Sequence, residues 1–211
     1  MNSITLSNKN IKNVILDARG VFMPTNKRIK KVESVVAGRT HNLLPVLEHV
    51  EDTGNSNACI RSAEAFGCQD VHIIERTGAK YYKGKRTSSG ATKWLDVHKW
   101  QDTATCLNAL KQQGYQVVVT TLKPGAVPIH QIDFSVPTAI LLGNEHEGAS
   151  QLAESLADHL AYIPMSGFVE SFNISVACAL SLYTAVLQRG DNHADMTDKE
   201  QQDLVKNYLD R

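Results

Sequence analysis

Polar side chains gather at four places in the sequence where an apolar segment ends, and such side chains can position a substrate. In chain order they are Asn55 with Arg61, Thr120, Glu145 with Glu147 directly after Gly143, and Ser171 with Asn173. A guanidinium in such a place can hold a phosphate or stabilise a developing negative charge, while amide and hydroxyl groups orient their partners. Structural roles stay open for two of these residues, since Arg61 could pair with Glu64 and Asn55 could cap the same helix.

The commonest catalytic and nucleotide-binding motifs are missing from this sequence. It contains no G-x-G-x-x-G, no phosphate-binding P-loop, no G-x-S-x-G and no H-E-x-x-H. This removes the usual dinucleotide, NTPase, hydrolase and zinc-protease interpretations. Glu145 and Glu147 flank His146, yet no second His or Cys cluster has the spacing of metal ligands, so we expect no metal site.

The polar clusters need a scaffold, and the surrounding sequence predicts alternating strands and helices. The apolar patterns indicate strands at 46–50, 71–75, 115–122, 138–143 and 159–165, and helices at 57–66, 103–113, 150–158 and 173–188. Continuous apolar strands between helices are typical of an α/β fold with a parallel sheet that helices cover on both faces. Ligands of such sheets bind outside the carboxyl ends of the strands, so we expect the clusters to meet at that edge.

Composition places these elements in one globular domain with short appendages. The chain has 211 residues, of which 42% are hydrophobic and 21% are charged. These values exclude the disordered, collagen-like and small disulfide-linked classes. We expect a domain at 41–190, an N-terminal extension at 1–40 and a helical tail at 191–211, with short peripheral helices in both terminal segments.

Charge is balanced overall, with 22 basic and 22 acidic residues, but it is unevenly distributed. Lysines and arginines cluster at 27–31 and at 80–86, where two tyrosines interleave with them, and acids crowd 191–203. Such basic runs either bind a nucleic acid or form solvated faces, and both interpretations stay open.

The cysteines and the N-terminal segment indicate a cytoplasmic protein. The four cysteines stand far apart without a C-x-x-C pair, which favours reduced thiols. The sequence contains no run of about 18 apolar residues, the length that a membrane-spanning helix needs. The first residues mix Asn, Lys and Asp with Ile, unlike the apolar region of a signal peptide.

Three segments resemble the motifs of one enzyme family, in the right order and at suitable spacing. They are NSNACIRSAEAFG from Asn55, ILLGNEHEGAS from Ile140 and IPMSGFVESFNISVACALSLY from Ile163. Together they resemble the SpoU branch of the SPOUT RNA 2′-O-methyltransferases. Within that branch, the segment SSGATKWLDVHKW from Ser88, the short basic extension and the tail ending in YLDR resemble the TrmH-type tRNA (guanosine-2′-O)-methyltransferases of D-loop position 18.

The resemblance implies a parallel sheet whose C-terminal part is threaded into a deep trefoil knot. That knot would form the S-adenosylmethionine pocket and the interface of a homodimer. General topology rules would not predict a knot, because they treat knots as rare exceptions. By position, the resemblance implies a cofactor pocket formed by Thr120, Gly143, Ile163, Met165 and Phe172.

The implied reaction is attack of a ribose 2′-OH on the methyl group of S-adenosylmethionine, without a metal. The hydroxyl is a poor nucleophile that must be positioned and must lose its proton. By resemblance, Arg61 engages the substrate phosphate and stabilises the developing alkoxide, since an arginine keeps its proton and is an implausible base. Asn55 would hold the first motif, Ser171 and Asn173 would orient Arg61 and the substrate, and Glu145 would support these loops.

The resemblance also implies an RNA partner, and the TrmH-type subgroup implies tRNA. We expect RNA contacts from basic residues in the extension, the central loop and the last long helix: Arg28, Arg39, Lys83, Lys85, Arg86, Lys93 and Arg189. One departure concerns the substrate, because many TrmH-type sequences carry His-Lys-Pro-His where this chain has EDTGN, with Glu51 and Asp52. Ribosomal RNA methylation, or RNA binding without catalysis on the same fold, stays open as an alternative.

Overall fold

A computed structural model describes residues 14–16, 22–76 and 90–211 of the chain and divides into two compact units. The larger unit spans 40–195, and the smaller unit combines the N-terminal segment to Arg39 with the C-terminal segment from Met196. The domain predicted at 41–190 has nearly the same boundaries as the larger unit. The two terminal segments, which were predicted as separate appendages, together form the smaller unit.

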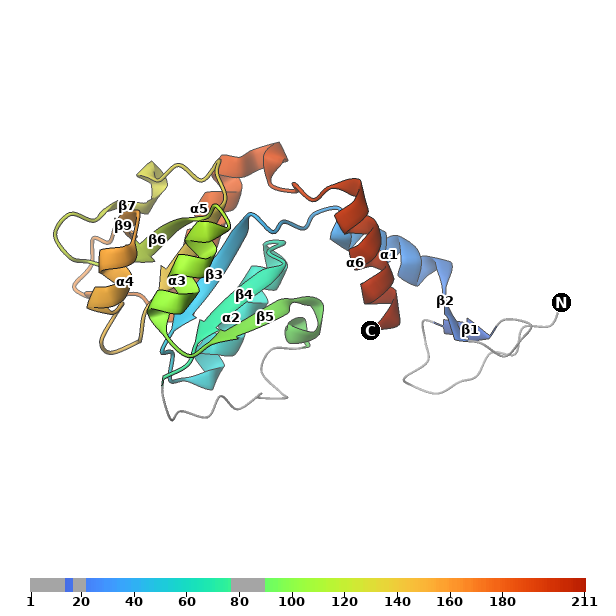
Figure 1. The fold of residues 1–211 in the computed structure, drawn as a ribbon, viewed down its shortest axis with the longest axis horizontal. Coiled ribbons are helices and arrows are strands. Elements are labelled where there is room, and N and C mark those ends of the chain that lie inside the picture. The colour runs from blue at the N-terminus through green and yellow to red at the C-terminus, as the bar shows by residue number, and fades with distance from the viewer. Residues whose placement is uncertain (1–13, 17–21, 77–89) are drawn as a thin grey trace. The chain divides into compact units, whose positions relative to one another are not determined.

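The larger unit is built on a seven-stranded sheet whose strands pair in parallel (Figure 1). In spatial order the strands are β5 (Asp96–Trp100), β4 (Asp70–Ile74), β3 (Leu43–Glu48), β8 (Thr138–Leu142), β6 (Gln116–Thr120), β9 (His159–Tyr162) and β7 (Val127–Pro128). The predicted α/β class with a parallel sheet is therefore confirmed. Five of these strands match the predicted segments to within a few residues.

Two strands and one strand boundary escaped the sequence pattern, each for a local reason. The edge strand β5 is partly exposed along its length and carries His and Lys, so it lacks an apolar run. The strand β7 has two residues, one of them Pro128. Strand β3 begins at Leu43 instead of Val46 and includes Pro45, a residue that cannot donate a hydrogen bond to a neighbouring strand.

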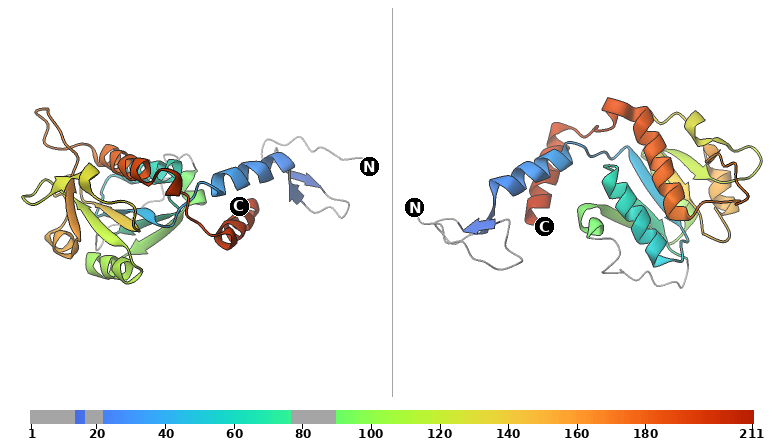
Figure 2. Two further views of the ribbon diagram at one scale, coloured as in Figure 1. Left: turned by 90° about the horizontal axis from the view of Figure 1, so that it is seen from above. Right: turned by 180° about the vertical axis from the view of Figure 1, so that it is seen from behind.

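Helices cover both faces of the sheet (Figures 1 and 2). One face carries α2 (Thr53–Ala65) and α5 (Ile174–Arg189), and the other carries α3 (Thr103–Gln112) and α4 (Gln151–Leu156). An apolar core lies on each face of the sheet, and alternate residues of β3 pack into one or the other. Leu43 and Leu47 pack on the side of α2 and α5, and Leu44 and Val46 pack on the side of α3 and α4. Burial on both faces explains why the central strands are continuously apolar.

The smaller unit packs two helices, α1 (Asn26–Val36) and α6 (Asp198–Asp210). A capping box starts α6, because Thr197 accepts from the Glu200 N–H and the Glu200 side chain accepts from the Thr197 N–H. The Arg28 guanidinium donates to the carbonyl of Tyr208, 3.2 Å away. The short antiparallel pair β1 (Val14–Leu16) and β2 (Phe22–Pro24) was not predicted from the sequence.

Two further expectations concern the whole chain. Within the described residues, no helix is both long enough and apolar enough to cross a membrane. Cys59, Cys68, Cys106 and Cys178 are buried free thiols, as their scattered positions indicated. Burial raises the pKa of the Cys106 thiol to about 12.

Candidate active site

A cavity of about 780 Å³ opens at the carboxyl edge of the sheet. The segments that follow β6, β8 and β9 line it, together with the start of α5. This volume is in the range of small-molecule sites, which is roughly 300–1,000 Å³. Nine residues that were selected from the sequence contribute to its wall: Thr120, Gly143, Glu145, Glu147, Ile163, Met165, Ser171, Phe172 and Asn173.

The loop after β8 folds back on itself, and this close approach requires a glycine. A Cβ placed on Gly143 would lie 2.1 Å from the Ala149 nitrogen and 2.2 Å from the Gly148 carbonyl carbon, distances that no folded chain tolerates. Asn144 and Gly148 exchange backbone hydrogen bonds of 3.0 and 2.9 Å. The cavity wall at Gly143 is consequently made of main chain.

Asn144 fixes the shape of this loop from inside. Its side-chain oxygen accepts the N–H groups of His146 and Glu147 at 2.8 and 3.1 Å, and its amide donates to the carbonyl of His49 at 2.8 Å. His49 has a positive φ of 54°. Asn144 therefore ties the loop after β8 to the loop after β3.

A chain of hydrogen bonds joins residues of all three sequence motifs. The Asn173 amide donates to the Asn55 side-chain oxygen at 3.0 Å, and the Asn55 amide donates to Glu145 at 2.9 Å. Asn173 also caps α5 by accepting the N–H of Ser175. Residues 90 and 118 positions apart in the chain are thus brought together.

Glu145 is held as a carboxylate by this arrangement. It also accepts the backbone N–H groups of Glu51 and Asp52 at 3.3 and 3.4 Å. Partial burial acts to raise the pKa of Glu145, but the hydrogen bonds from Asn55 and the backbone outweigh it and lower that pKa. Hydrogen bonds to the charged form of an acid favour that form.

A second carboxylate, Glu48, lies at the carboxyl end of β3 and was not selected from the sequence. Glu48 ends β3, is buried, and accepts the Thr103 hydroxyl at 2.5 Å. It also accepts both the N–H and the hydroxyl of Ser150, at 2.9 and 2.7 Å. An acidic residue at the end of an apolar strand could have signalled this, since a buried charge needs several partners.

Arg61 lies apart from the hydrogen-bonded chain. It is exposed on α2 and does not line the cavity, and no described residue gives it a hydrogen bond or an ion pair. The structure therefore brings Asn55, Glu145, Ser171 and Asn173 to the cavity but leaves Arg61 outside it. In the described part of the chain, no hydrogen bond or ion pair joins Arg61 to Glu64, which was the structural alternative.

At the rim of the cavity, Arg76 bridges two carboxylates. Its Nη1 lies 3.0 Å from Glu51 Oε1, and its Nη2 lies 3.2 Å from Glu147. The hydrogen bonds to Glu147 and Glu51 raise the pKa of the Arg76 guanidinium. The sequence analysis passed over Arg76, although an arginine directly after an apolar strand is a recognisable signal.

The residues expected to contact RNA fall into three groups. Lys83, Lys85 and Arg86 lie outside the described residues. Lys93 is exposed, with its ammonium 4.3 Å from the Trp94 ring centroid, and Arg28 is half-buried. The expectation that Arg39 and Arg189 contact RNA is corrected, because both side chains are buried. Arg39 is 1% exposed and Arg189 is 6% exposed.

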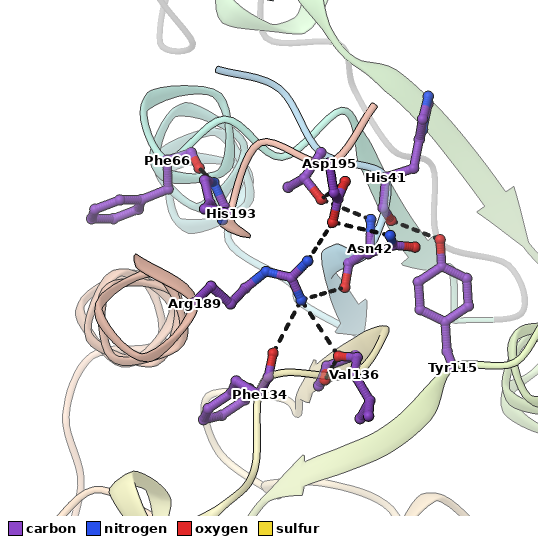
Figure 3. A network of polar contacts seen from close by, with 11 residues as sticks. His41, Asn42, Phe66, Tyr115, Phe134, Val136, Arg189, His193 and Asp195 are labelled. Atoms are coloured by element: carbon purple, nitrogen blue, oxygen red, sulfur yellow. Dashed lines mark hydrogen bonds and ion pairs between the residues drawn. The ribbon is translucent and has the colours of Figure 1, made fainter. Parts of the chain in front are cut away.

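The burial of these two arginines follows from their partners. Arg39 lies over the ring of Tyr208, 5.9 Å from its centroid. Arg189 points toward the carbonyls of Phe134 and Val136 and is paired with Asp195 (Figure 3). Both guanidinium groups serve the packing of the chain instead of presenting a charge to RNA.

No group of three or more His, Cys, Asp and Glu side chains in the described ranges is arranged to hold a metal ion. A metal site was not expected from the sequence.

Comparisons with known proteins place this geometry in context. Residues 42–183 match the model of the SpoU rRNA Methylase family. A tRNA (guanosine(18)-2′-O)-methyltransferase of Borreliella burgdorferi is 31% identical over 87% of this chain and 88% of its own.

Two solved structures are also similar to the chain. A TrmH/SpoU tRNA modifying enzyme of A. aeolicus matches with a TM-score of 0.80 and 29% identity, over 87% of this chain and 96% of that one. An AdoMet-bound rRNA methyltransferase of Sinorhizobium meliloti matches with a TM-score of 0.61 and 28% identity, over 69% and 56% respectively.

Proposed function

Because the chain belongs to the SpoU rRNA methylase family, we propose that it methylates the ribose 2′-OH of guanosine 18 in the D-loop of tRNA. S-adenosylmethionine is the methyl donor. The observation that carries this proposal is the cavity at the carboxyl edge, where residues of the second and third motifs form the wall and Asn55 of the first is hydrogen-bonded to it. The similar enzyme from Borreliella burgdorferi bears the name of this reaction.

The cavity residues fit S-adenosylmethionine. Gly143 exposes main chain where any Cβ would collide with the opposite backbone, and Ile163, Met165 and Phe172 supply apolar surface for an adenine. Thr120 closes the wall, with its hydroxyl donating to the carbonyl of Leu141 at 3.0 Å. When bound, this cofactor supplies a methyl group activated by a positively charged sulfur.

The remaining residues would prepare the ribose for attack. Arg61 has no partner within the described chain, so its guanidinium is available to hold the substrate phosphate and to stabilise the developing alkoxide. Asn55, Glu145 and Asn173 hold the three motif segments together through their hydrogen bonds. Ser171 lies exposed at the cavity, where it would orient the substrate.

We further propose a homodimer built on α5. Its solvent-facing side carries an apolar stripe at helical spacing, formed by Val176, Leu180, Tyr183 and Leu187, all exposed. Phe168 and Val169, in the segment before the helix, are also exposed apolar side chains. Sedimentation equilibrium should report twice the mass of the chain, and Leu187→Glu should shift it toward the monomer.

Three further proposals concern the knot, the RNA contacts and the location of the protein. The convergence of the segments after β6, β8 and β9 on one cavity supports the deep trefoil knot in the C-terminal part of the sheet. The basic residues Lys83, Lys85 and Arg86, with Lys93 and Arg28, are proposed to bind the RNA backbone. The four free thiols support a cytoplasmic location.

The test is methyl transfer from labelled S-adenosylmethionine into bulk tRNA and, separately, into ribosomal RNA, with mapping of the labelled nucleoside. We expect one 2′-O-methylguanosine in the D-loop of tRNA. Labelling of ribosomal RNA alone would keep the reaction and replace the substrate. Labelling of neither RNA would contradict an enzymatic function and favour RNA binding without catalysis.

A further inference from the structure

The rim bridge, formed by Glu51, Arg76 and Glu147, connects three loops at the carboxyl edge of the sheet. Glu51 follows β3, Arg76 follows β4 and Glu147 follows β8. Glu147 lines the cavity, and the N–H of Glu51 donates to Glu145, whose side chain also lines it. The Arg76 guanidinium therefore contacts a side chain that lines the cavity, close to where a substrate would enter.

The three side chains of the rim bridge are open to solvent. The exposed fractions are 49% for Arg76, 55% for Glu51 and 64% for Glu147. Ion pairs with this exposure contribute little to stability, and water or another anion can replace either partner. A buried pair such as Arg189 with Asp195, at 4% and 21% exposure, does not have that freedom.

The rim bridge is also unbalanced in charge, since one guanidinium faces two carboxylates. An approaching phosphate meets net repulsion as long as both carboxylates stay in place. The guanidinium, however, presents a planar fork that binds a phosphate in two places at once. A phosphate that displaces one carboxylate gains two charge-assisted hydrogen bonds.

On these grounds we propose that Arg76 is a second RNA-binding arginine of the active site, which exchanges its carboxylate partners for a phosphate of the RNA backbone. In the free protein, Glu51 and Glu147 hold the guanidinium at the cavity rim and lower the affinity for RNA. The inference rests on the proposed function for the identity of the anion. Glu51 stands in the EDTGN segment, so the same exchange gives that segment a role in substrate binding.

The first experiment substitutes Arg76→Ala and measures the binding of bulk tRNA as a function of salt, together with KM for tRNA and kcat. We expect the dissociation constant and KM to rise about fivefold to tenfold, and the salt slope to fall by about one. The affinity for S-adenosylmethionine and kcat should change less than about twofold.

Lys111→Ala is the matched control for this substitution. Lys111 forms a comparable surface ion pair with Asp158 at 2.8 Å, at the opposite edge of the sheet. This variant should leave tRNA binding unchanged. If Arg76→Ala instead leaves RNA affinity intact and lowers thermal stability or kcat, Arg76 is a structural latch and the proposal is wrong.

The second experiment uses Glu51→Gln alone and in combination with Arg76→Ala. The single variant should bind tRNA about threefold to fivefold more tightly, because it releases the guanidinium and removes a repelling charge. Most of that gain should vanish in the double variant, since the guanidinium is then absent. A gain that persists undiminished without Arg76 would mean that Glu51 acts only by repulsion, which overturns the exchange.

Asp191→Asn serves as the carboxylate control. Asp191 follows α5, whose 16 residues span about 24 Å from the cavity end, so tRNA binding should not change. Direct binding keeps this inference separate from the proposed function. If no RNA becomes methylated but Arg76→Ala still weakens RNA binding, the exchange stands and the catalytic assignment falls.

Discussion

The two edges of the central sheet use the same residue types in opposite ways. At the amino edge, the buried Arg189 donates to the carbonyl of Phe134 at 3.0 Å and forms an ion pair with Asp195 (Figure 3). On α2, the helix that follows the carboxyl end of β3, Arg61 is exposed and no described residue pairs with it. An arginine whose partners all lie within the protein is structural, whereas an exposed and unpaired arginine is available to a substrate.

The acids of the two edges differ in the same manner. At the amino edge, Asp70 lies 2.6 Å from a ring nitrogen of His41 and 2.7 Å from one of His98. Burial opposes ionisation, but these two contacts outweigh it and lower the pKa of Asp70 to about 2. At the carboxyl edge, Glu145 and Glu147 line a cavity that a ligand can enter. We therefore expect changes at the amino edge to alter stability and changes at the carboxyl edge to alter catalysis.

Arg189→Ala should produce the largest effect, and it should be on stability. The substitution leaves Asp195 and the backbone carbonyls at the amino edge without their buried partner. Loss of one member of a buried ion pair costs about 3–5 kcal/mol in the free energy of unfolding. Urea denaturation would measure it. A loss below about 1 kcal/mol would break the comparison.

Arg61→Ala should have the next largest effect, and it should be on catalysis alone. Because the guanidinium makes no contact within the described chain, its removal should change stability by less than about 0.5 kcal/mol. Methyl transfer at saturating tRNA should fall by about 10²–10³-fold, while the affinity for S-adenosylmethionine is retained. Near-normal turnover would show that Arg61 is an ordinary surface arginine. Arg61→Lys tests whether the planar fork is needed.

The acid dependence of stability should report the amino edge through Asp70. The folded-state pKa of this carboxyl is depressed from 3.8 to about 2. Its contribution is therefore present above pH 3.8 and is lost as pH falls through 2, a decline of about 2–3 kcal/mol. Urea denaturation between pH 5 and 2 would measure it, and Asp70→Asn should flatten the curve in that window.

The same pair offers a second measurement with the opposite sign. The hydrogen bond to Asp70 raises the pKa of His98, so this contribution is present below the ordinary histidine pKa and is lost as pH rises through the raised value. NMR titration should show the His98 pKa moving back toward 6.5 in Asp70→Asn. An unchanged His98 titration would contradict the contact.

Glu145→Gln should have the smallest effect and belongs to the carboxyl edge. The amide keeps an acceptor for Asn55, but it loses the charge that the N–H groups of Glu51 and Asp52 stabilise. We expect about a tenfold decrease in kcat, with stability within about 1 kcal/mol of the parent. A loss of stability without a change in kcat would assign Glu145 to the scaffold. Asp191→Asn is the control.

Local pattern predicted much of the scaffold and a large part of the cavity. The central strands were recognisable because their residues are apolar on both faces, and helices α3 and α5 because apolar residues recur at helical spacing. All five residues expected around the cofactor line the cavity, since they lie at or after the carboxyl ends of strands. Edge strand β5 was missed because half-exposed positions interrupt its pattern.

The sequence by itself determined which segments become strands and helices and which polar residues follow them, because side-chain periodicity records local burial. Only the tertiary structure decided which charged residues are buried or paired within the protein and which stay exposed. It buries Arg39 and Arg189, gives Arg76 two carboxylate partners and leaves Arg61 exposed. These outcomes depend on partners far away in the chain, such as Phe134 for Arg189, and a local pattern carries no record of such partners.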